Sequence, residues 1–503
     1  MPASSASLLL LSVLLSGLSC VLGAIHPYNQ DYFYAVGDAY IFRGGREGLY
    51  ASTKEALEKW GNWGEIAPGI SNGQSEIKFT QLEFARSQAI ASQFEPDEGY
   101  TGLIQAVIFE VQDRNLIGYP TPYGYRYCCT KDIVPKTKCH QDRLIVQQKD
   151  DGWPKVLDIY FENNDTIALS WDEAITIEST GMYYLWFVIC DEDLQAATVR
   201  GQTTWKNPTG YLPGMMYPNI KFFGVMSLSY ITLGVVWAAL YGRFWRDVFM
   251  LQHCITAVVA LGMMEMSTWY FDYVNFNTTG SRPYLTTFYA VLLGCLRKTI
   301  SRILVLIVSM GFGIVLPYLG VIQKQIIALG ASYFVAVSAL DFVTNVGTID
   351  DLRSTARILL VLPVAILDAV FILWVFTSLS KTLNQLQARR ATSKLELYRR
   401  FTNTLALMVW VSVAWIAYEM YYKVTDQYNE RWQSDWIASD FWYILNFVFL
   451  SVVCTLFRPS VHSTRFAYSD VEGEDEYEQV EIGQTRPRGS KGADAEDEAG
   501  KLE

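Results

Sequence analysis

Ionisable side chains interrupt the long apolar runs in the second half of this 503-residue sequence. One run carries three cations, Arg297, Lys298 and Arg302, and their spacing places Lys298 and Arg302 on one face of a helix. Five further runs each carry a single acid: Glu265, Asp341, Asp368, Glu419 and Asp440. A charge at the centre of a bilayer costs roughly 2.5–3.5 kcal/mol, so these groups must face one another or water.

The sequence offers no catalytic constellation. Gly69-Ile-Ser71-Asn-Gly73 matches the GxSxG pattern of serine hydrolases, which requires a preceding strand, a following helix and a later histidine base. Here the pattern follows Pro68 in a loop, and His140 is the only later histidine in the amino-terminal half. Metalloprotease, Walker and dinucleotide-binding motifs are absent, so we expect no enzyme and no cofactor. The net charge of −11 argues against a nucleic-acid partner, because phosphate binding needs a basic face.

The apolar runs are long enough to cross a membrane, because a spanning helix needs about 20 mostly apolar residues. We expect the third span to be longer than the bilayer requires and to project into the cytosol. The seven predicted spans are Ile220–Tyr241, Val248–Thr268, Thr286–Val315, Gln325–Val343, Ile358–Leu379, Thr404–Tyr422 and Trp436–Phe457.

The loops between the spans indicate the orientation. Two loops are basic: the first–second loop holds Arg243 and Arg246, and the fifth–sixth loop holds Lys381, Arg389, Arg390, Lys394, Arg399 and Arg400. The loops on the other side have fewer bases and hold Asp350, Asp351, Asp426 and Glu430. Because cytoplasmic loops are enriched in Lys and Arg, we expect a luminal amino terminus and a cytosolic carboxyl terminus.

In this orientation the intramembrane charges allow two interpretations. They could form internal ion pairs that fix the packing of the helices, or they could line a polar cavity that opens toward the lumen. Such a cavity would hold a lipid headgroup, an ion or part of a membrane-protein client. Counted from the span ends, Asp368 and Arg302 lie near the middle of the bilayer. The luminal half holds Glu265, Asp341, Glu419 and Asp440.

Residues 24–217 have the mixed composition of a folded domain, and the second half of this segment looks all-β. Its short apolar runs are bounded by Gly, Pro and Asp: Leu103–Val111, Leu144–Val146 and Val156–Phe161. Ile175–Ile177, Gly181 and Tyr183–Cys190 predict two strands joined by a turn, the second central to a β-sandwich. The first half, including Lys54–Trp63, is expected to be helical or irregular.

Four cysteines lie in this predicted luminal domain: Cys128, Cys129, Cys139 and Cys190. An even number in an oxidising compartment predicts two disulfides. Adjacent cysteines rarely pair, so Cys128 and Cys129 are each expected to bond to Cys139 or Cys190, and the pairing stays open. The absence of a CxxC pair argues against a metal site.

Two glycosylation sequons fall on the luminal side in the predicted topology. They are Asn164-Asp-Thr, within the amino-terminal domain, and Asn277-Thr-Thr, after the second span. We therefore expect a glycan at Asn164 and at Asn277.

Both ends of the chain resemble targeting segments. Residues 1–23 have the apolar core and small-residue cleavage site of a signal peptide. Residues 458–503 form an acidic cytosolic tail with 12 acids and six bases, which we expect to be unfolded. Two tail segments, Tyr468 to Val471 and Tyr477 to Val480, have the tyrosine-x-x-apolar form that clathrin adaptors bind.

Several segments resemble the lung seven-transmembrane receptor family, also described as Golgi-dynamics-domain seven-transmembrane proteins, and within it the transmembrane protein 87 branch. In the membrane half they are Arg297–Pro317, Leu397–Leu405, Asp440–Trp442, Phe457–Ser460 and Arg465–Tyr468. The strand Gly181–Cys190 is similar to the late strand of a Golgi-dynamics β-sandwich. The resemblance implies a membrane protein with a luminal β-sandwich followed by a seven-helix transmembrane bundle.

The resemblance also implies a location and a role. It places the chain in the Golgi membrane, cycling through endosomes, as a non-enzymatic trafficking factor that escorts or retrieves membrane clients or lipids. The alternative is a Golgi cation channel, for which relatives use acids on the second and third helices. Glu265 matches the first position, and Val291 stands at the second. A G-protein coupled receptor is the third choice, because the Asp-Arg-Tyr and Asn-Pro-x-x-Tyr motifs are missing.

Overall fold

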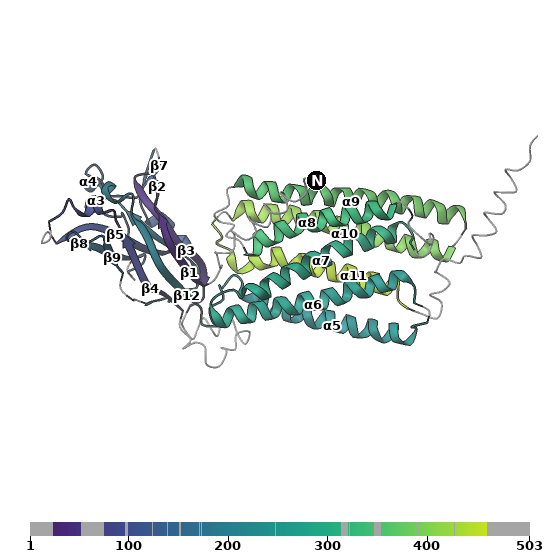
Figure 1. The fold of residues 1–503 in the computed structure, drawn as a ribbon. Coiled ribbons are helices and arrows are strands. Elements are labelled where there is room, and N and C mark those ends of the chain that lie inside the picture. The colour runs from purple at the N-terminus through teal and green to yellow at the C-terminus, as the bar shows by residue number, and fades with distance from the viewer. Residues whose placement is uncertain are drawn as a thin grey trace, which may run out of the picture.

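The computed structural model describes residues 24–51 and 75–459, except 96–98, 123, 138, 150–151, 171, 173, 247, 313–319, 321, 347–353, 391 and 427 (Figure 1). Several predictions fall on residues that it does not describe. They concern the signal peptide, the segment Lys54–Trp63, the Gly69–Gly73 pattern and the tyrosine motifs of the tail.

The amino-terminal β-domain contains two antiparallel sheets, each with five strands among the described residues. The first has the order β1-β12-β4-β10. On the edge of β4 that faces away from β12, β10 pairs with the beginning of β4 and β9 pairs with its end. The second has the order β2-β3-β11-β5-β8. The strands of the first sheet are β1 Ile25–Tyr32, β4 Glu76–Ala85, β9 Ile167–Leu169, β10 Ala174–Thr176 and β12 Thr198–Lys206. Those of the second are β2 Tyr34–Val36, β3 Ala39–Leu49, β5 Tyr100–Glu110, β8 Lys155–Glu162 and β11 Gly181–Ile189.

The two sheets pack face to face as a sandwich. Phe79 and Val199 of the first sheet share one core with Ile104, Phe161 and Phe187 of the second. β11 pairs with β3 on one side and β5 on the other, and most of its side chains are buried on both faces. The predicted central position of this strand is therefore confirmed.

Other predictions for the β-domain need correction. β10 and β11 are not a hairpin, because β10 pairs with β4 in the first sheet and β11 lies in the second, so the chain crosses between sheets. The first half of the domain contains long strands, since β3 and β4 alternate buried and exposed side chains. Leu144–Val146 makes only isolated bridges. The short elements are η1 Val111–Leu116, α3 Gln88–Ala91, β6 Tyr119–Thr121, β7 Gly124–Arg126, α4 Val134–Thr137 and η2 Glu192–Leu194.

Two disulfides hold the loops beside β11, which confirms the predicted number. Cys128 bonds to Cys190, directly after β11, and Cys129 bonds to Cys139. Each of the adjacent cysteines thus takes one of the two partners that the sequence left open.

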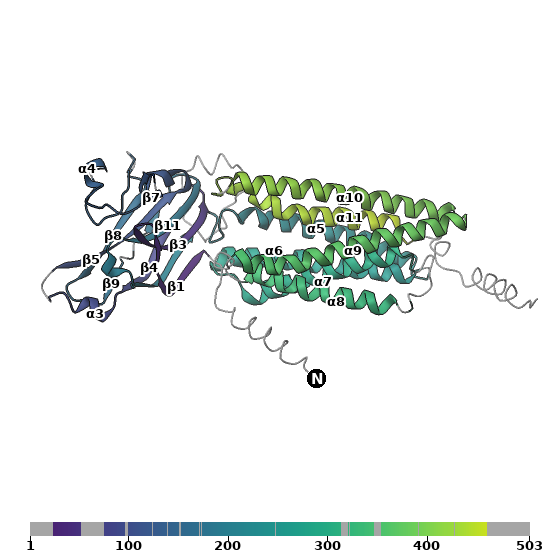
Figure 2. The ribbon, with the colours of Figure 1, turned by 90° about the horizontal axis from the view of Figure 1, so that it is seen from above.

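Among the described residues, seven long helices follow the β-domain and run side by side, with the β-domain at one end of the bundle (Figures 1 and 2). Six of these seven are long and apolar enough to cross a membrane by length and composition, and α7 differs by its three cations. The helices are α5 Tyr217–Arg243, α6 Met250–Thr279, α7 Tyr284–Ser309, α8 Ile322–Val346, α9 Ser354–Ala388, α10 Thr392–Thr425 and α11 Asp435–Leu456, with η4 Trp432–Ser434 before α11.

Most helix ends differ from the predicted spans: α9 runs to Ala388 and α10 begins at Thr392, so the predicted loop between them is mostly helical. Two further differences, in α6 and α7, lie closer to the charged residues. α6 continues to Thr279, where Gly280 ends it in the left-handed conformation with φ 77°. α7 ends at Ser309, and Gly311 has φ 83° two residues later. The expected extension of this span to Val315 is therefore wrong for the described residues.

Candidate functional site

The three cations of α7 each face a different neighbouring helix. α7 packs against α6, α8 and α9. Arg297 donates from Nε and Nη2 to the two carboxylate oxygens of Glu265 on α6, with 3.3 Å between Nη2 and Oε1. The side chains are only 4% and 1% exposed. Gly294 leaves room for this pair, because a Cβ there would lie 2.9 Å from Oε1 of Glu265.

The other two pairs are more open. Lys298 donates to Asp341 of α8 at 2.6 Å, and these side chains are 31% and 18% exposed. Arg302 donates to Asp368 of α9 at 2.5 Å, and these are 35% and 31% exposed. The guanidinium of Arg302 also lies 4.6 Å from the ring centre of Tyr333. A sealed pair and two partly exposed pairs therefore occur on the same helix.

A cavity lies beside these cations, between α6–α7 on one side and α10–α11 on the other. The volume of this cavity is about 40 Å³, which is room for about three water molecules. Its polar lining comes from Arg297, Lys298, Ser301, Arg302 and Asn446. The apolar lining is Val258, Leu304, Val305, Val308, Phe401, Phe449, Leu450 and Val453.

The cavity does not lie where the sequence suggested. Its lining starts half-way along α7, at Arg297, and continues to Val308 near the carboxyl end of that helix. On α11 it covers Asn446 to Val453, in the half remote from the β-domain (Figure 1). The cavity therefore lies in the half of the bundle remote from the β-domain, and its opening toward the lumen stays a prediction. The acids Glu265, Asp341 and Asp368 do not line it, because each bonds to its cation from a neighbouring helix.

Comparison with known families agrees with this architecture. Residues 218–464, which contain all seven helices apart from the first residue of α5, match the family described as GOST, seven transmembrane domain. The helical half of this chain is a GOST seven-transmembrane domain. The resemblance to the lung seven-transmembrane receptor family, drawn from the α7 and α10 motifs, is thereby confirmed.

Relatives of the GOST domain come from animals and fungi. Transmembrane protein 87A of Homo sapiens is 38% identical over 279 residues, covering 55% of this chain and 49% of that protein. Transmembrane protein 87B of Mus musculus is 34% identical over 277 residues, with 55% and 49% covered. Membrane protein PTM1 of Saccharomyces cerevisiae is 23% identical over 405 residues, with 74% of each covered. The chain spans about half the length of the transmembrane protein 87 relatives.

Two predicted acids of the GOST domain lie away from α7's cations. Glu419 accepts from Lys423, one turn further along α10, at 2.6 Å. Asp440 is buried, 3% exposed, and its Oδ2 has no hydrogen-bond partner among the described residues. A buried polar atom without a hydrogen bond is costly, so Asp440 is a candidate contact for a group that the chain itself does not supply.

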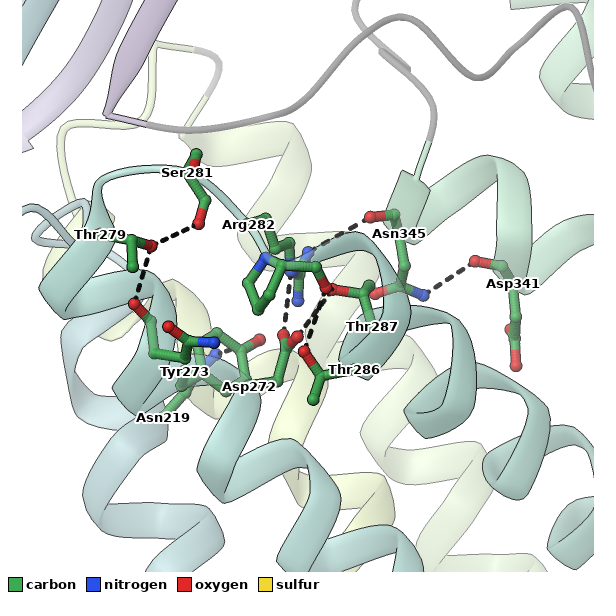
Figure 3. Close-up of polar contacts among 12 residues, drawn as sticks. Asn219, Asp272, Tyr273, Thr279, Ser281, Arg282, Thr286, Thr287, Asp341 and Asn345 are labelled. Carbon is green, nitrogen blue, oxygen red and sulfur yellow. Dashed lines mark hydrogen bonds and ion pairs between the residues drawn. The ribbon is translucent and has the colours of Figure 1, made fainter.

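The sequence analysis missed a buried network at the β-domain end of the GOST domain (Figure 3). Arg282 donates to Asp272 at 3.1 Å and to the carbonyl of Asn345 on α8 at 3.3 Å. Thr287 of α7 donates to the other oxygen of Asp272 at 2.7 Å. The predicted span ends at Thr268, four residues before Asp272. Because α6 continues to Thr279, Asp272 is a buried helix residue whose contacts connect α6 with α7 and, through Arg282, with α8.

The two sequons have opposite environments. Asn164 is exposed in the turn between β8 and β9. Asn277 is 8% exposed, and its Nδ2 donates to the carbonyl of Thr209 at 2.9 Å while its Oδ1 accepts from the N–H of Leu212 at 3.1 Å. A glycan on Asn277 would displace these bonds, and Gly210 lies directly against the amide, so the glycan predicted there requires this end of α6 to open.

Proposed function

We propose that this chain is a trafficking factor of the Golgi membrane that cycles through endosomes and escorts or retrieves a membrane client or a lipid. The observation that carries the proposal is the cavity beside α7, where polar side chains gather inside an apolar bundle. Arg302 uses Nε for Asp368 and keeps further N–H donors. An anionic or polar client group, such as a lipid headgroup, can therefore contact Lys298 and Arg302 without breaking the helix pairs.

Two features support the proposed compartment. The GOST domain is similar to the transmembrane protein 87 proteins, and the β-domain holds two disulfides. Disulfides form and persist in oxidising compartments, which include the lumen of the secretory pathway. A luminal β-domain would place such disulfides where they are stable.

Basic residues favour the same orientation. Arg243 ends α5, and Arg389 and Arg390 lie between α9 and α10, all at the end remote from the β-domain (Figure 1). An excess of Lys and Arg marks the cytosolic side. The tail would then be cytosolic, and its segments from Tyr468 and Tyr477 would be accessible to clathrin adaptors.

Three features favour the escort over a cation channel. Glu265, the acid expected to attract cations, is sealed in its pair with Arg297. Val291, at the second channel position, is 2% exposed and apolar. The polar lining of the cavity carries cationic side chains, which repel a permeating cation.

Loss of the protein tests the proposal. The full chain with a small carboxyl-terminal tag should co-localise with Golgi and endosome markers. Surface and Golgi proteomes of cells that lack the chain should show a defined set of missorted membrane proteins or a changed lipid profile, restored by the wild-type chain. Unchanged proteomes and lipids would contradict the escort role, and cation flux through liposomes holding the purified chain would favour the channel.

A further inference from the structure

The β-domain holds the loop between α10 and α11 through a buried tryptophan. Trp432 is 3% exposed and packs against Val111 and Met182, with its ring centre 5.2 Å from that of Tyr50. The backbone of β3 lies directly against the indole, because a Cβ at Gly48 would lie 2.5 Å from Cε3 of Trp432. This contact is as closely packed as a protein core.

Polar contacts surround the tryptophan. Nη1 of Arg114 donates to Oε1 of Glu430 at 2.8 Å, and the same guanidinium lies 3.9 Å from the ring centre of Tyr428. The Tyr184 hydroxyl donates to the Tyr428 carbonyl at 3.3 Å. We call Trp432, Glu430 and Tyr428, with their β-domain partners, the latch.

The loop that carries the latch is stiffened from within. The carboxylate of Asp426 accepts the N–H groups of Glu430 at 2.7 Å and Arg431 at 2.8 Å. The hydroxyl of Tyr422, near the end of α10, donates to the Arg431 carbonyl at 2.8 Å. A displacement of Trp432 therefore moves α10 and α11 with it, because these bonds keep the shape of the loop fixed.

A second attachment joins the β-domain to α6. Asn277, near the end of α6, bonds to Thr209 and Leu212 of the segment that leaves β12. That segment is tied to β3, because the side chain of Asn207 accepts from the N–H of Tyr50 at 3.0 Å. The β-domain thus contacts both α6 and the α10–α11 loop, at the same end of the bundle.

These two attachments lie on the two opposing walls of the cavity. α6 and α7 form one wall, and α10 and α11 form the other. At the remote end the walls are tied by hydrogen bonds, from Tyr398 to the Val308 carbonyl and from Gln252 to the Phe457 carbonyl, both at 3.0 Å. Between the ends α11 meets α5 through rings such as Tyr230 and Phe447. Apolar contacts of this kind can slide without leaving a bond unmade.

We propose that the latch closes the cavity: while Trp432 is seated in the β-domain the walls stay together, and its release lets α10 and α11 swing outward about the remote end. Asn446 lies three turns into α11, roughly 16 Å from its start, so a rigid helix carries the displacement to the cavity. The inference uses the cavity but does not depend on what the cavity carries.

The test measures access to the cavity in the purified full chain. Ser301, a cavity residue, is changed to Cys in a chain whose Cys20, Cys254, Cys295 and Cys454 are Ala, with both disulfides kept. The rate at which a membrane-impermeant thiol reagent labels Ser301→Cys is then compared with and without Trp432→Ala. We expect labelling at least about tenfold faster with Trp432→Ala, because truncating a buried Trp removes the main docking contact. Trp410→Ala, at a Trp that is 74% exposed on α10, should leave the rate unchanged.

Charge reversal supplies a second test that does not empty a core. Arg114 and Glu430 are both partly exposed. Arg114→Glu alone should speed labelling several-fold, and Arg114→Glu with Glu430→Arg should return it to the parental rate. Equal labelling rates in the parent, Trp432→Ala and Arg114→Glu would overturn the latch. The latch would also be overturned if Arg114→Glu is labelled faster than the parent and Arg114→Glu with Glu430→Arg does not return to the parental rate. A sorting defect plays no part in these measurements, so they can fail or succeed independently of the proposed trafficking role.

Discussion

α7 carries one sealed ion pair and two open ones, and the difference separates assembly from function. The pair of Arg297 and Glu265 is almost fully buried, and although Arg297 borders the cavity, the two charges are committed to each other. The pairs made by Lys298 and Arg302 keep about a third of each cation exposed beside the cavity. Three cations within six residues therefore divide into one that holds α6 to α7 and two that can meet a client.

Neutralising the sealed pair should have the largest effect. Glu265→Gln keeps the shape but leaves the Arg297 charge buried without its counter-ion, a change that costs about 3–5 kcal/mol in buried pairs. The apparent melting temperature of the detergent-solubilised chain should fall steeply, and little protein should leave the endoplasmic reticulum. Glu265→Gln with Arg297→Gln should recover part of the loss. Wild-type stability of the single variant would show that water reaches Arg297.

The same chemical change in an open pair should cost far less. Asp368→Asn removes the partner of Arg302, which can turn to water in the cavity, and exposed pairs contribute only about 0–1 kcal/mol. The melting temperature should shift by a few degrees at most, and the protein should reach its normal compartment. A loss as large as that of Glu265→Gln would erase the distinction between the two kinds of pair.

Asp440 extends the comparison to an acid with no cation. Its Oδ2 has no partner among the described residues, and a buried polar atom without a hydrogen bond is costly. Asp440→Asn should leave the melting temperature unchanged or raise it slightly. A fall comparable to that of Glu265→Gln would mean that a cation binds Asp440 in the membrane.

The two sequons repeat the contrast between a buried, bonded side chain and an exposed one. Changes at them should have the smallest effect on the fold. Asn164→Gln should abolish the gel-mobility shift that follows glycosidase treatment, because its side chain is exposed. Asn277 should be found unmodified by mass spectrometry, because both ends of its amide are bonded. A glycan on Asn277 would show that this end of α6 is open in the cell.

The sequence was sufficient for the helices because bilayer thickness imposes a long apolar run on each one. It also singled out Arg297, Lys298 and Arg302, since charges in such runs are rare. It could not say which acid meets which cation. Glu265 and Arg297 are 32 residues apart and Arg302 and Asp368 are 66 apart, and only helix packing brings them together.

Other misses share a physical cause. The sequence around β10 and β11 indicates a hairpin, because the apolar pattern of a strand does not show to which sheet the strand belongs. The burial of Asn277 could not be predicted either, because a sequon says nothing of the packing around it. Trp432 gave no signal as a latch, because its pocket is formed by β3, β11 and η1, which are distant in sequence.

The central claim is that the open cations serve the client while the acids only position them. Its most direct test is rescue in cells that lack the chain. Asp341→Asn with Asp368→Asn keeps both cations and should restore sorting of the missorted proteins or lipids. Lys298→Gln with Arg302→Gln, expressed at the same level in the same compartment, should not. Full restoration by the cation variant would contradict the account.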